Sequence, residues 1–277
     1  MKLGRAAMIT ACILALVYVS VLLVAVAAKP HLTFLPMQRS IASCFPSKVD
    51  VFVTSQGARV HGWFVPGNPG YSGKHVLFAH GNGGNVSYYQ AQVSLFLELG
   101  CSVWTFDYPG FGQSEGRPTE AGCHSAAYAF YEEVRKVAEP NDIVLAGFSL
   151  GGAVAGRLAT RVPHHALVLI ATFVNPRYLV KTIAWPLWLW SFVATEFDLE
   201  ADLRTLAHPT RAAIYHSRTD GLIDFCHAER NAATLGCPVV EIGGWHGEPL
   251  FDAAALDNLR TVIHASECLP NCSLPPR

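Results

Sequence analysis

The sequence has few charged residues: they make up 15% of its 277 residues, and the net charge is −1. A clustered basic face, which nucleic-acid-binding domains use to meet phosphates, is therefore not expected, and nucleic acid is excluded as a partner. The chain also lacks internal repeats and low-complexity tracts, which argues against a solenoid or fibrous protein. Hydrophobic residues make up 51% of the chain, enough to fill the core of one large domain.

The eight cysteines do not form the Cys-x-x-Cys pairs that are typical of a zinc site. Cys101 and Cys237 adjoin apolar runs and are expected to be small buried residues. Cys268 and Cys272 lie close together in a Pro-rich tail, where an oxidising compartment favours a disulfide and a reducing one favours free thiols. The pattern predicts no metal centre and leaves the redox compartment open.

One long stretch, residues 6–28, contains no charged residue. A helix rises about 1.5 Å per residue, so this stretch is long enough to cross a bilayer core of about 30 Å. A cleaved signal peptide is the alternative, because Ala25-Val26-Ala27 resembles a cleavage site, but the apolar core of a signal peptide is shorter. We therefore predict a single-pass membrane anchor at residues 1–29. Positive charges flank it on both sides, so the side of the membrane on which the following domain lies is open, with a slight preference for a cytosolic N-terminus from Lys2 and Arg5.

After the anchor, short apolar runs alternate with stretches of helical pattern, which is typical of an α/β fold with a mostly parallel, doubly wound sheet and helices on both faces. The expected strands are 49–53, 60–65, 75–79, 102–106, 143–146, 166–170, 211–215 and 239–242, and the expected helices are 86–99, 119–137, 153–159 and 250–264. The expected domain organisation is an anchor at 1–29, a linker at 30–47, a domain at 48–265 with an insertion at about 173–207, and a tail at 266–277. The insertion breaks the alternation, and a short cap over the active site fits it best.

The motif Gly147-Phe148-Ser149-Leu150-Gly151 lies between an expected strand and an expected helix. This is the context of a nucleophile elbow, in which a tight turn lifts a serine hydroxyl above the edge of the sheet. Gly147 and Gly151 leave room where a Cβ would collide with backbone. Ser149 would lie at a helix N-terminus, which favours developing negative charge. The competing interpretation is a small-residue turn without chemistry, so the other motifs decide.

The motif His80-Gly81-Asn82-Gly83-Gly84-Asn85 follows the expected strand at 75–79. A serine hydrolase needs two N–H donors aimed at the carbonyl oxygen as it becomes an oxyanion. The residue after the nucleophile, Leu150, is predicted to supply one, and a glycine-rich loop supplies the other, which we assign to Asn82. The alternative is an ordinary loop rich in glycine and asparagine.

Acidic residues and a histidine follow later strands. Asp107 precedes Ser149, whereas the triad order in such a sheet is serine, acid, base, so Asp107 is interpreted as structural. Asp220, after the strand 211–215, is the predicted acid, and Asp224 is its rival, with a helix N-cap as its other interpretation. His246 lies on a Gly-rich loop after the last strand and is the predicted base. This triad requires no metal and no organic cofactor.

Three tryptophans lie in the expected cap, namely Trp185, Trp188 and Trp190. They are the candidate substrate-binding residues, because they would line a pocket for an acyl chain. Two alternatives stay open. The tryptophans would also fit at the bilayer interface, where Trp is favoured, or in ordinary packing under the cap.

From about Leu35 to His264 the chain resembles membrane-anchored serine hydrolases of the α/β-hydrolase-domain (ABHD) type. The resemblance rests on the motifs 62–66, 80–85, 107–116 and 147–152. It implies an α/β-hydrolase fold in which Ser149 is the nucleophile, Asp220 the acid and His246 the base. The chain departs from the family pattern at two places: Ser217 replaces a glycine before the acid, and Trp245 and Gly247-Glu248 flank the base.

The expected function is therefore that of a membrane-anchored serine hydrolase, which cleaves carboxylic esters or thioesters of lipid or acyl-protein type. One alternative is a non-catalytic membrane scaffold that retains the fold. The other is a serine peptidase or amidase on the same fold. The sequence leaves the substrate, the preference among ester, thioester and amide, and the oligomeric state open.

Overall fold

The computed structural model describes residues 8–10, 12–13, 16–20, 34–67, 72–183, 197–206 and 211–265. The chain divides into two compact units, residues 1–35 and 36–277. In the first unit, the described residues from 8 to 20 are helical. No helix within the described ranges has the length and apolarity needed to cross a membrane. The anchor predicted at residues 6–28 lies in part outside the described residues and stays a prediction.

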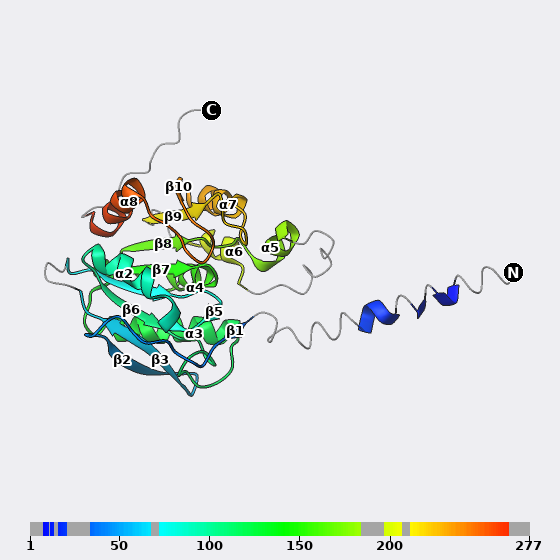
Figure 1. Cartoon of the computed structure of the whole chain (residues 1–277), viewed down its shortest axis with the longest axis horizontal. Helices are drawn as coiled ribbons and strands as arrows, with labels where there is room; N and C mark the ends of the chain where they lie inside the picture. Colours follow the sequence, from blue (N-terminus) through cyan, green and yellow to red (C-terminus); the bar gives the residue numbers. More distant parts are fainter. Residues whose placement is uncertain are drawn as a thin grey trace, which may run out of the picture. The chain divides into compact units, whose positions relative to one another are not determined.

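An eight-stranded sheet forms the centre of the second unit. Its strands follow the order β10-β9-β8-β7-β4-β6-β3-β2, which runs from top to bottom in Figure 1. Strand β3 pairs antiparallel with β2 and β6, and every other neighbouring pair is parallel, so the predicted mostly parallel sheet is confirmed. The strands are β2 (Val49–Ser55), β3 (Ala58–Val65), β4 (His75–Ala79), β6 (Ser102–Phe106), β7 (Ile143–Phe148), β8 (Ala166–Ile170), β9 (Ala212–Ser217) and β10 (Val239–Ile242), with the two-residue strands β1 (Leu35–Pro36) and β5 (Gly83–Gly84) outside this sheet.

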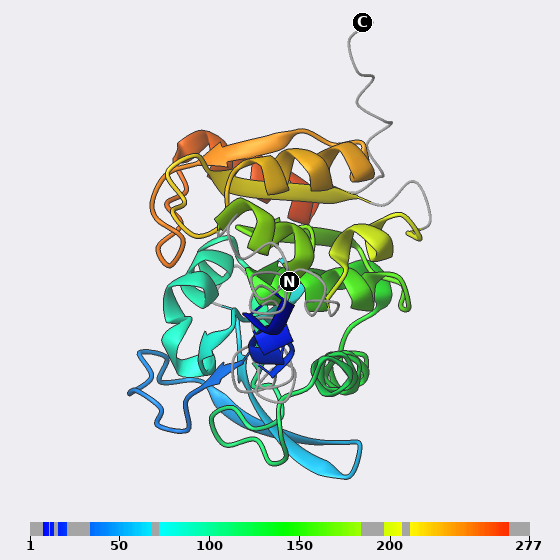
Figure 2. The same ribbon diagram turned by 90° about the vertical axis from the view of Figure 1, so that its right-hand side faces the viewer.

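Helices cover both faces of the sheet. Phe96 of α2 and Leu259 of α8 belong to one buried cluster with Phe78 of β4, which places these two helices on the same face. On the opposite face α3 comes so close to β3 that a Cβ on Gly62 would lie 2.6 Å from the Phe130 ring. Figure 2 shows α2 and α3 on opposite sides of the strands. The helices are α2 (Gln90–Glu98), α3 (Glu120–Val134), α4 (Leu150–Ala159), α5 (Pro176–Ile183), α6 (Leu199–Leu203), α7 (Cys226–Leu235) and α8 (Ala253–His264), with the 3-10 turns η1 (Val86–Tyr88) and η2 (Pro140–Asp142).

The central strands are rich in apolar residues because both of their faces are covered. Every residue of β4, β6, β7 and β8 is buried. Alternate side chains face opposite helical layers, so each must be compatible with a core. This is why the sequence predicts the bounds of these interior strands to within two residues.

Helices α2 and α8 differ from their predicted bounds because side chains cap the backbone near their predicted N-termini. The helix expected at 86–99 is divided, because Asn85 Oδ1 accepts a hydrogen bond from Ser87 N (3.0 Å) and caps the turn η1 before α2 begins. The last helix starts three residues later than expected. Leu250 pairs with Gly243 in an isolated bridge, and Asp252 Oδ1 caps Ala255 N at 2.8 Å.

The segment at residues 37–44 packs against the loop that follows β4. Met37 N donates to Gly84 O (3.1 Å) and Ile41 N donates to Ser87 Oγ (2.9 Å). The segment therefore lies beside the loop that contains the predicted oxyanion donor. In the insertion at 173–207, the helices α5 and α6 are described, and residues 184–196 lie outside the described ranges.

Candidate active site

Ser149 lies at the turn between β7 and α4, and its backbone has φ 53° and ψ −117°. A non-glycine residue at this φ is strained, so neighbouring groups must hold it in place. Two hydrogen bonds do so: Ser149 N donates to Ile170 O (2.9 Å), and Thr172 Oγ1 donates to Ser149 O (2.7 Å). No sequence motif marks Thr172, whose only signal is its position just after strand β8.

The two glycines that flank Ser149 are required by close backbone contacts. A Cβ on Gly147 would lie 2.1 Å from Gly151 O, and a Cβ on Gly151 would lie 1.9 Å from Ala79 O. Both distances are far below van der Waals contact, so no side chain fits at either position. The spacing Gly-x-Ser-x-Gly thus follows from the packing of α4 against the ends of β7 and β4.

The structure brings the three predicted triad residues together at the carboxyl edge of the sheet. His246 Nε2 lies 3.0 Å from Ser149 Oγ, and His246 Nδ1 lies 2.7 Å from Asp220 Oδ2. Ser149 follows β7, Asp220 follows β9 and His246 follows β10. The parallel strands therefore deliver all three side chains to one edge, as the rule for open α/β sheets requires.

Asp220 is held by more than His246. Its Oδ1 accepts hydrogen bonds from Leu222 N (2.9 Å) and Ile223 N (2.8 Å). Burial acts to raise the pKa of Asp220, but the hydrogen bonds from His246 and from these amides outweigh it and hold the pKa below its usual value. The carboxylate is therefore ionised at neutral pH and fixed beside the imidazole.

The rival acid, Asp224, has a different partner. Its Oδ1 accepts a hydrogen bond from Cys226 N (2.9 Å) at the start of α7. A second histidine, the buried His216, lies beside Asp220. Its Nε2 is 3.6 Å from Asp220 Oδ2 and 2.8 Å from Ile223 O. Burial lowers the pKa of His216, so it is neutral and donates to the Ile223 carbonyl.

The predicted oxyanion donors lie on two elements beside Ser149. Leu150 is the first residue of α4, and the amides of a first helical turn have no acceptor within the helix. Asn82 lies half-buried on the loop after β4. A Cβ on Gly81 would lie 2.8 Å from Tyr89 Oη and 3.1 Å from the Phe148 ring, so the loop backbone approaches the elbow closely.

Apolar side chains are exposed around the triad. Trp245, directly before His246, is 72% exposed, and Leu222 and Leu250 on neighbouring loops are also exposed. The Phe148 ring lies 5.2 Å from the His246 ring. Leu222, Trp245 and Leu250 lie on the loops that carry Asp220 and His246, and we call these three exposed residues the apolar rim. Trp185, Trp188 and Trp190, the predicted substrate-binding residues, lie outside the described residues.

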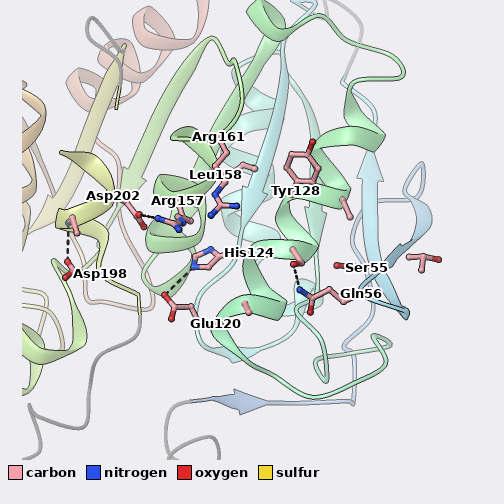
Figure 3. A pocket seen from close by; sticks show the side chains of 15 residues that line it. Ser55, Gln56, Glu120, His124, Tyr128, Arg157, Leu158, Arg161, Asp198 and Asp202 are labelled. Atoms are coloured by element: carbon pink, nitrogen blue, oxygen red, sulfur yellow. Dashed lines mark hydrogen bonds and ion pairs between the residues drawn. The ribbon is translucent and has the colours of Figure 1, made fainter. Parts of the chain in front are cut away.

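A groove of about 790 Å³ lies elsewhere, between α3, α4, α6 and the β2–β3 turn (Figure 3). Its described lining includes two ion-paired contacts, Arg157 with Asp202 and His124 with Glu120. The triad residues are not among the residues that line it.

Over the described part of the chain, no three His, Cys, Asp or Glu side chains gather in a way that would hold a metal ion.

The strand order and the strained serine turn between a strand and a helix define an α/β hydrolase. Residues 76–267 match the sequence model of the alpha/beta hydrolase family, and the chain belongs to this family. This confirms the expected fold and the family part of the ABHD-type resemblance.

Three similar proteins illustrate the range of the family. An uncharacterized protein of Mycobacterium tuberculosis is 41% identical over 140 residues, 49% of this chain and 50% of that protein. The lysophosphatidylserine lipase ABHD12 of Danio rerio is 36% identical over 118 residues, 39% of this chain and 30% of that protein. The structure of the Pyrococcus furiosus esterase PF2001 superimposes with a TM-score of 0.61 at 18% identity, over 78% of this chain and 90% of the esterase. The chain spans about half the length of the first curated relatives, 50% for the mycobacterial protein.

Proposed function

We propose that the chain is a serine hydrolase that cleaves carboxylic esters or thioesters through Ser149, His246 and Asp220. One observation carries the proposal: the imidazole of His246 bridges Ser149 Oγ at 3.0 Å and Asp220 Oδ2 at 2.7 Å. An ionised Asp220 holds the proton of the neutral imidazole on Nδ1, which leaves the lone pair of Nε2 directed at the serine hydroxyl. His246 can therefore act as a general base on Ser149.

The reaction follows from this geometry. Ser149 Oγ attacks the acyl carbonyl carbon while Nε2 of His246 takes the hydroxyl proton. The amides of Asn82 and Leu150 stabilise the oxyanion, and the protonated imidazole then gives its proton to the leaving alcohol or thiol. A water molecule, activated by His246, attacks the acyl-enzyme, and the carboxylic acid leaves as Ser149 regains its proton.

An apolar acyl group is the substrate class that fits the rim of the site. The apolar rim is made of three exposed side chains on the triad loops, Trp245, Leu222 and Leu250. Exposed apolar surface of this kind often marks a binding site for an apolar ligand. A relative that is 36% identical over 118 residues is named lysophosphatidylserine lipase ABHD12. We therefore favour lipid or acyl-protein substrates over small polar esters.

A membrane location agrees with such a substrate. The uncharged segment at residues 6–28 would anchor the chain in a bilayer. Extraction of the cell membranes with alkaline carbonate tests this directly. The full chain is expected to stay in the pellet and a chain that starts at residue 36 is expected to leave it; a full chain released by carbonate would overturn the anchor while leaving the hydrolase proposal intact.

Labelling with a fluorophosphonate probe tests the nucleophile. The wild type and a Ser72→Ala control, which changes an exposed serine, are expected to be labelled, and Ser149→Ala is not. Equal labelling of Ser149→Ala would overturn the assignment. A panel of esters, thioesters and amides with matched acyl chains then tests the reaction class, and faster cleavage of the amides would replace the esterase proposal by a peptidase.

A further inference from the structure

Asp107 is a buried carboxylate that the proposed reaction does not use. Its side chain is 1% exposed. Oδ1 accepts a hydrogen bond from Val86 N (2.8 Å), and Oδ2 lies 3.1 Å from His61 Nδ1. A Cβ on Gly112 would lie 2.1 Å from Asp107 Oδ2, so the motif 107–116 is shaped around this carboxylate. An unpaired charge at such a position would be strongly destabilising, so its partners matter.

His80 Nε2 lies 3.6 Å from Asp107 Oδ1, and His61 is the closer histidine beside this charge. Its second ring nitrogen, Nε2, lies 2.9 Å from Asp50 Oδ1, and Asp50 in turn binds Lys48 Nζ at 2.6 Å. Both nitrogens of His61 face carboxylate oxygens, so both donate when the ring is protonated, and this arrangement favours the positively charged ring. Groups of alternating charge thus run from the half-buried Lys48 inward to Asp107.

This series of charges ends at the loop that contains Asn82. Residues 80–86, defined as the oxyanion loop, are held by hydrogen bonds along their length. Tyr108 Oη donates to His80 O (2.6 Å) at the start, and Tyr89 Oη donates to Gly83 O (2.7 Å) in the middle. Asp107 accepts from Val86 N at the end. The adjacent residues Asp107 and Tyr108 therefore fix both ends of the oxyanion loop.

We propose that Asp107 and His61 form a positioning pair, which fixes the oxyanion loop so that the Asn82 amide meets the developing oxyanion above Ser149. This inference rests on the proposed function. The pair touches neither Ser149 nor the substrate; it acts through Val86 and the loop. Its effect should therefore be on the transition state, in which the oxyanion forms, and not on binding of the uncharged substrate.

The electrostatics of His61 give the pair a pH dependence. Burial acts to lower the pKa of His61, but the hydrogen bonds to Asp107 and Asp50 outweigh it and raise the pKa above its usual value. The stabilisation from this proton is complete below the unfolded-state pKa of about 6.5 and is lost as the pH rises through the raised folded-state pKa. The charged or titratable groups on the elements around His61 are Lys48 and Asp50 of β2 and its approach, Arg59 of β3, His80 of the oxyanion loop, and Asp107 and Glu115 of the following loop.

Substitutions of Asp107 separate positioning from folding. Asp107→Ala removes the acceptor of Val86 N and is expected to lower kcat about 10²-fold, because a displacement of about 1 Å costs that much, with KM within about threefold. Asp107→Asn keeps an acceptor oxygen at Val86 N and is expected to recover at least about tenfold of that loss. A folded Asp107→Ala with the kcat of the wild type, or a loss that appears in KM alone, would overturn the proposal.

A substitution of Asp50, which lies at the surface end of the series of charges, tests the proposal even if Asp107→Ala does not fold. Asp50 is 43% exposed and pairs with a lysine, and Asp142, 44% exposed and paired with Lys74, is a matched control away from the series. Asp50→Asn removes one of the two carboxylates that hold the proton of His61. The alkaline limb of its kcat profile is expected to move to lower pH, and that of Asp142→Asn is expected to stay in place. Superimposable profiles for Asp50→Asn and the wild type would overturn the positioning pair; a wild type that cleaves no ester or thioester would overturn the proposed function instead.

Discussion

Replacing Asp220 by asparagine tests the geometry of the triad most directly. Asp220 Oδ1 accepts hydrogen bonds from Leu222 N and Ile223 N, and Oδ2 accepts from His246 Nδ1. In the variant the amide oxygen must take the Oδ1 position, because two N–H donors face it. The NH2 group then faces Nδ1 of His246.

This orientation places the imidazole proton on the wrong nitrogen. An NH2 group can only donate, so Nδ1 must accept, and the proton of the neutral ring moves to Nε2. Nε2 is the atom that lies 3.0 Å from Ser149 Oγ, and once protonated it cannot take the serine proton. We expect kcat to fall about 10⁴-fold, a loss of about 5 kcal/mol of transition-state stabilisation, while KM changes little because the fold and the substrate contacts persist.

The matched control is Asp224→Asn, which changes the rival acid in the same way. Asp224 accepts from Cys226 N, and an amide oxygen preserves that bond, so kcat is expected to stay within about threefold of the wild type. Steady-state kinetics with a chromogenic short-chain ester measures both variants, and thermal unfolding verifies that they fold. A kcat for Asp220→Asn within tenfold of the wild type would refute the reasoning, as would a larger loss for Asp224→Asn.

The Asp220→Asn substitution should also change how the stability of the folded protein depends on acid pH. The lowered pKa of Asp220 stabilises the folded wild type above the unfolded-state pKa of about 3.9, and this contribution is lost as the pH falls through the folded-state pKa. The difference in Tm between the wild type and Asp220→Asn should therefore narrow as the pH falls below about 3.9. A difference that stays constant down to pH 2 would contradict this.

Three further substitutions test separate parts of the structure. Gly151→Ala places a Cβ 1.9 Å from Ala79 O, so it should lower Tm and reduce kcat about 10²-fold. Gly83→Ala is the control, because its Cβ meets nothing within 4 Å. Equal kinetics for the two variants would refute the packing argument. Thr119→Ala removes the N-cap hydrogen bond from Gly122 N (3.0 Å) and should lower the free energy of unfolding by about 1 kcal/mol, or Tm by about 2–4 °C, with kcat unchanged. An unchanged Tm would contradict this prediction. Trp245→Ala should reduce the preference for long over short acyl esters without lowering Tm, and an unchanged chain-length preference would exclude Trp245 from the apolar rim.

Much of the fold is predictable because local patterns specify it. The buried strands β4, β6 and β8 are rich in apolar residues, and their predicted bounds agree with the structure. The apolar pattern alone predicts α4 only from residue 153, since Leu150, Gly151 and Gly152 carry little helical pattern, whereas the Gly-x-Ser-x-Gly motif places the helix N-terminus at Ser149. The helix starts there because Ser149 ends the strand with a positive φ, and a pattern of apolar residues contains no information on that turn.

The sequence by itself determined the family motifs, the succession of strands and helices along the chain, and the positions of Ser149, Asp220 and His246 after their strands. Local spacing is sufficient for these, because a parallel sheet delivers every strand end to one edge. Only the tertiary structure decided which carboxylate faces His246 and which histidine lies closest to Asp107. These contacts join residues 26 and 46 positions apart in the chain. Hydrogen-bond partners at such separations are selected by packing, in which a buried charge must find its counter-charge, and no local pattern encodes that choice.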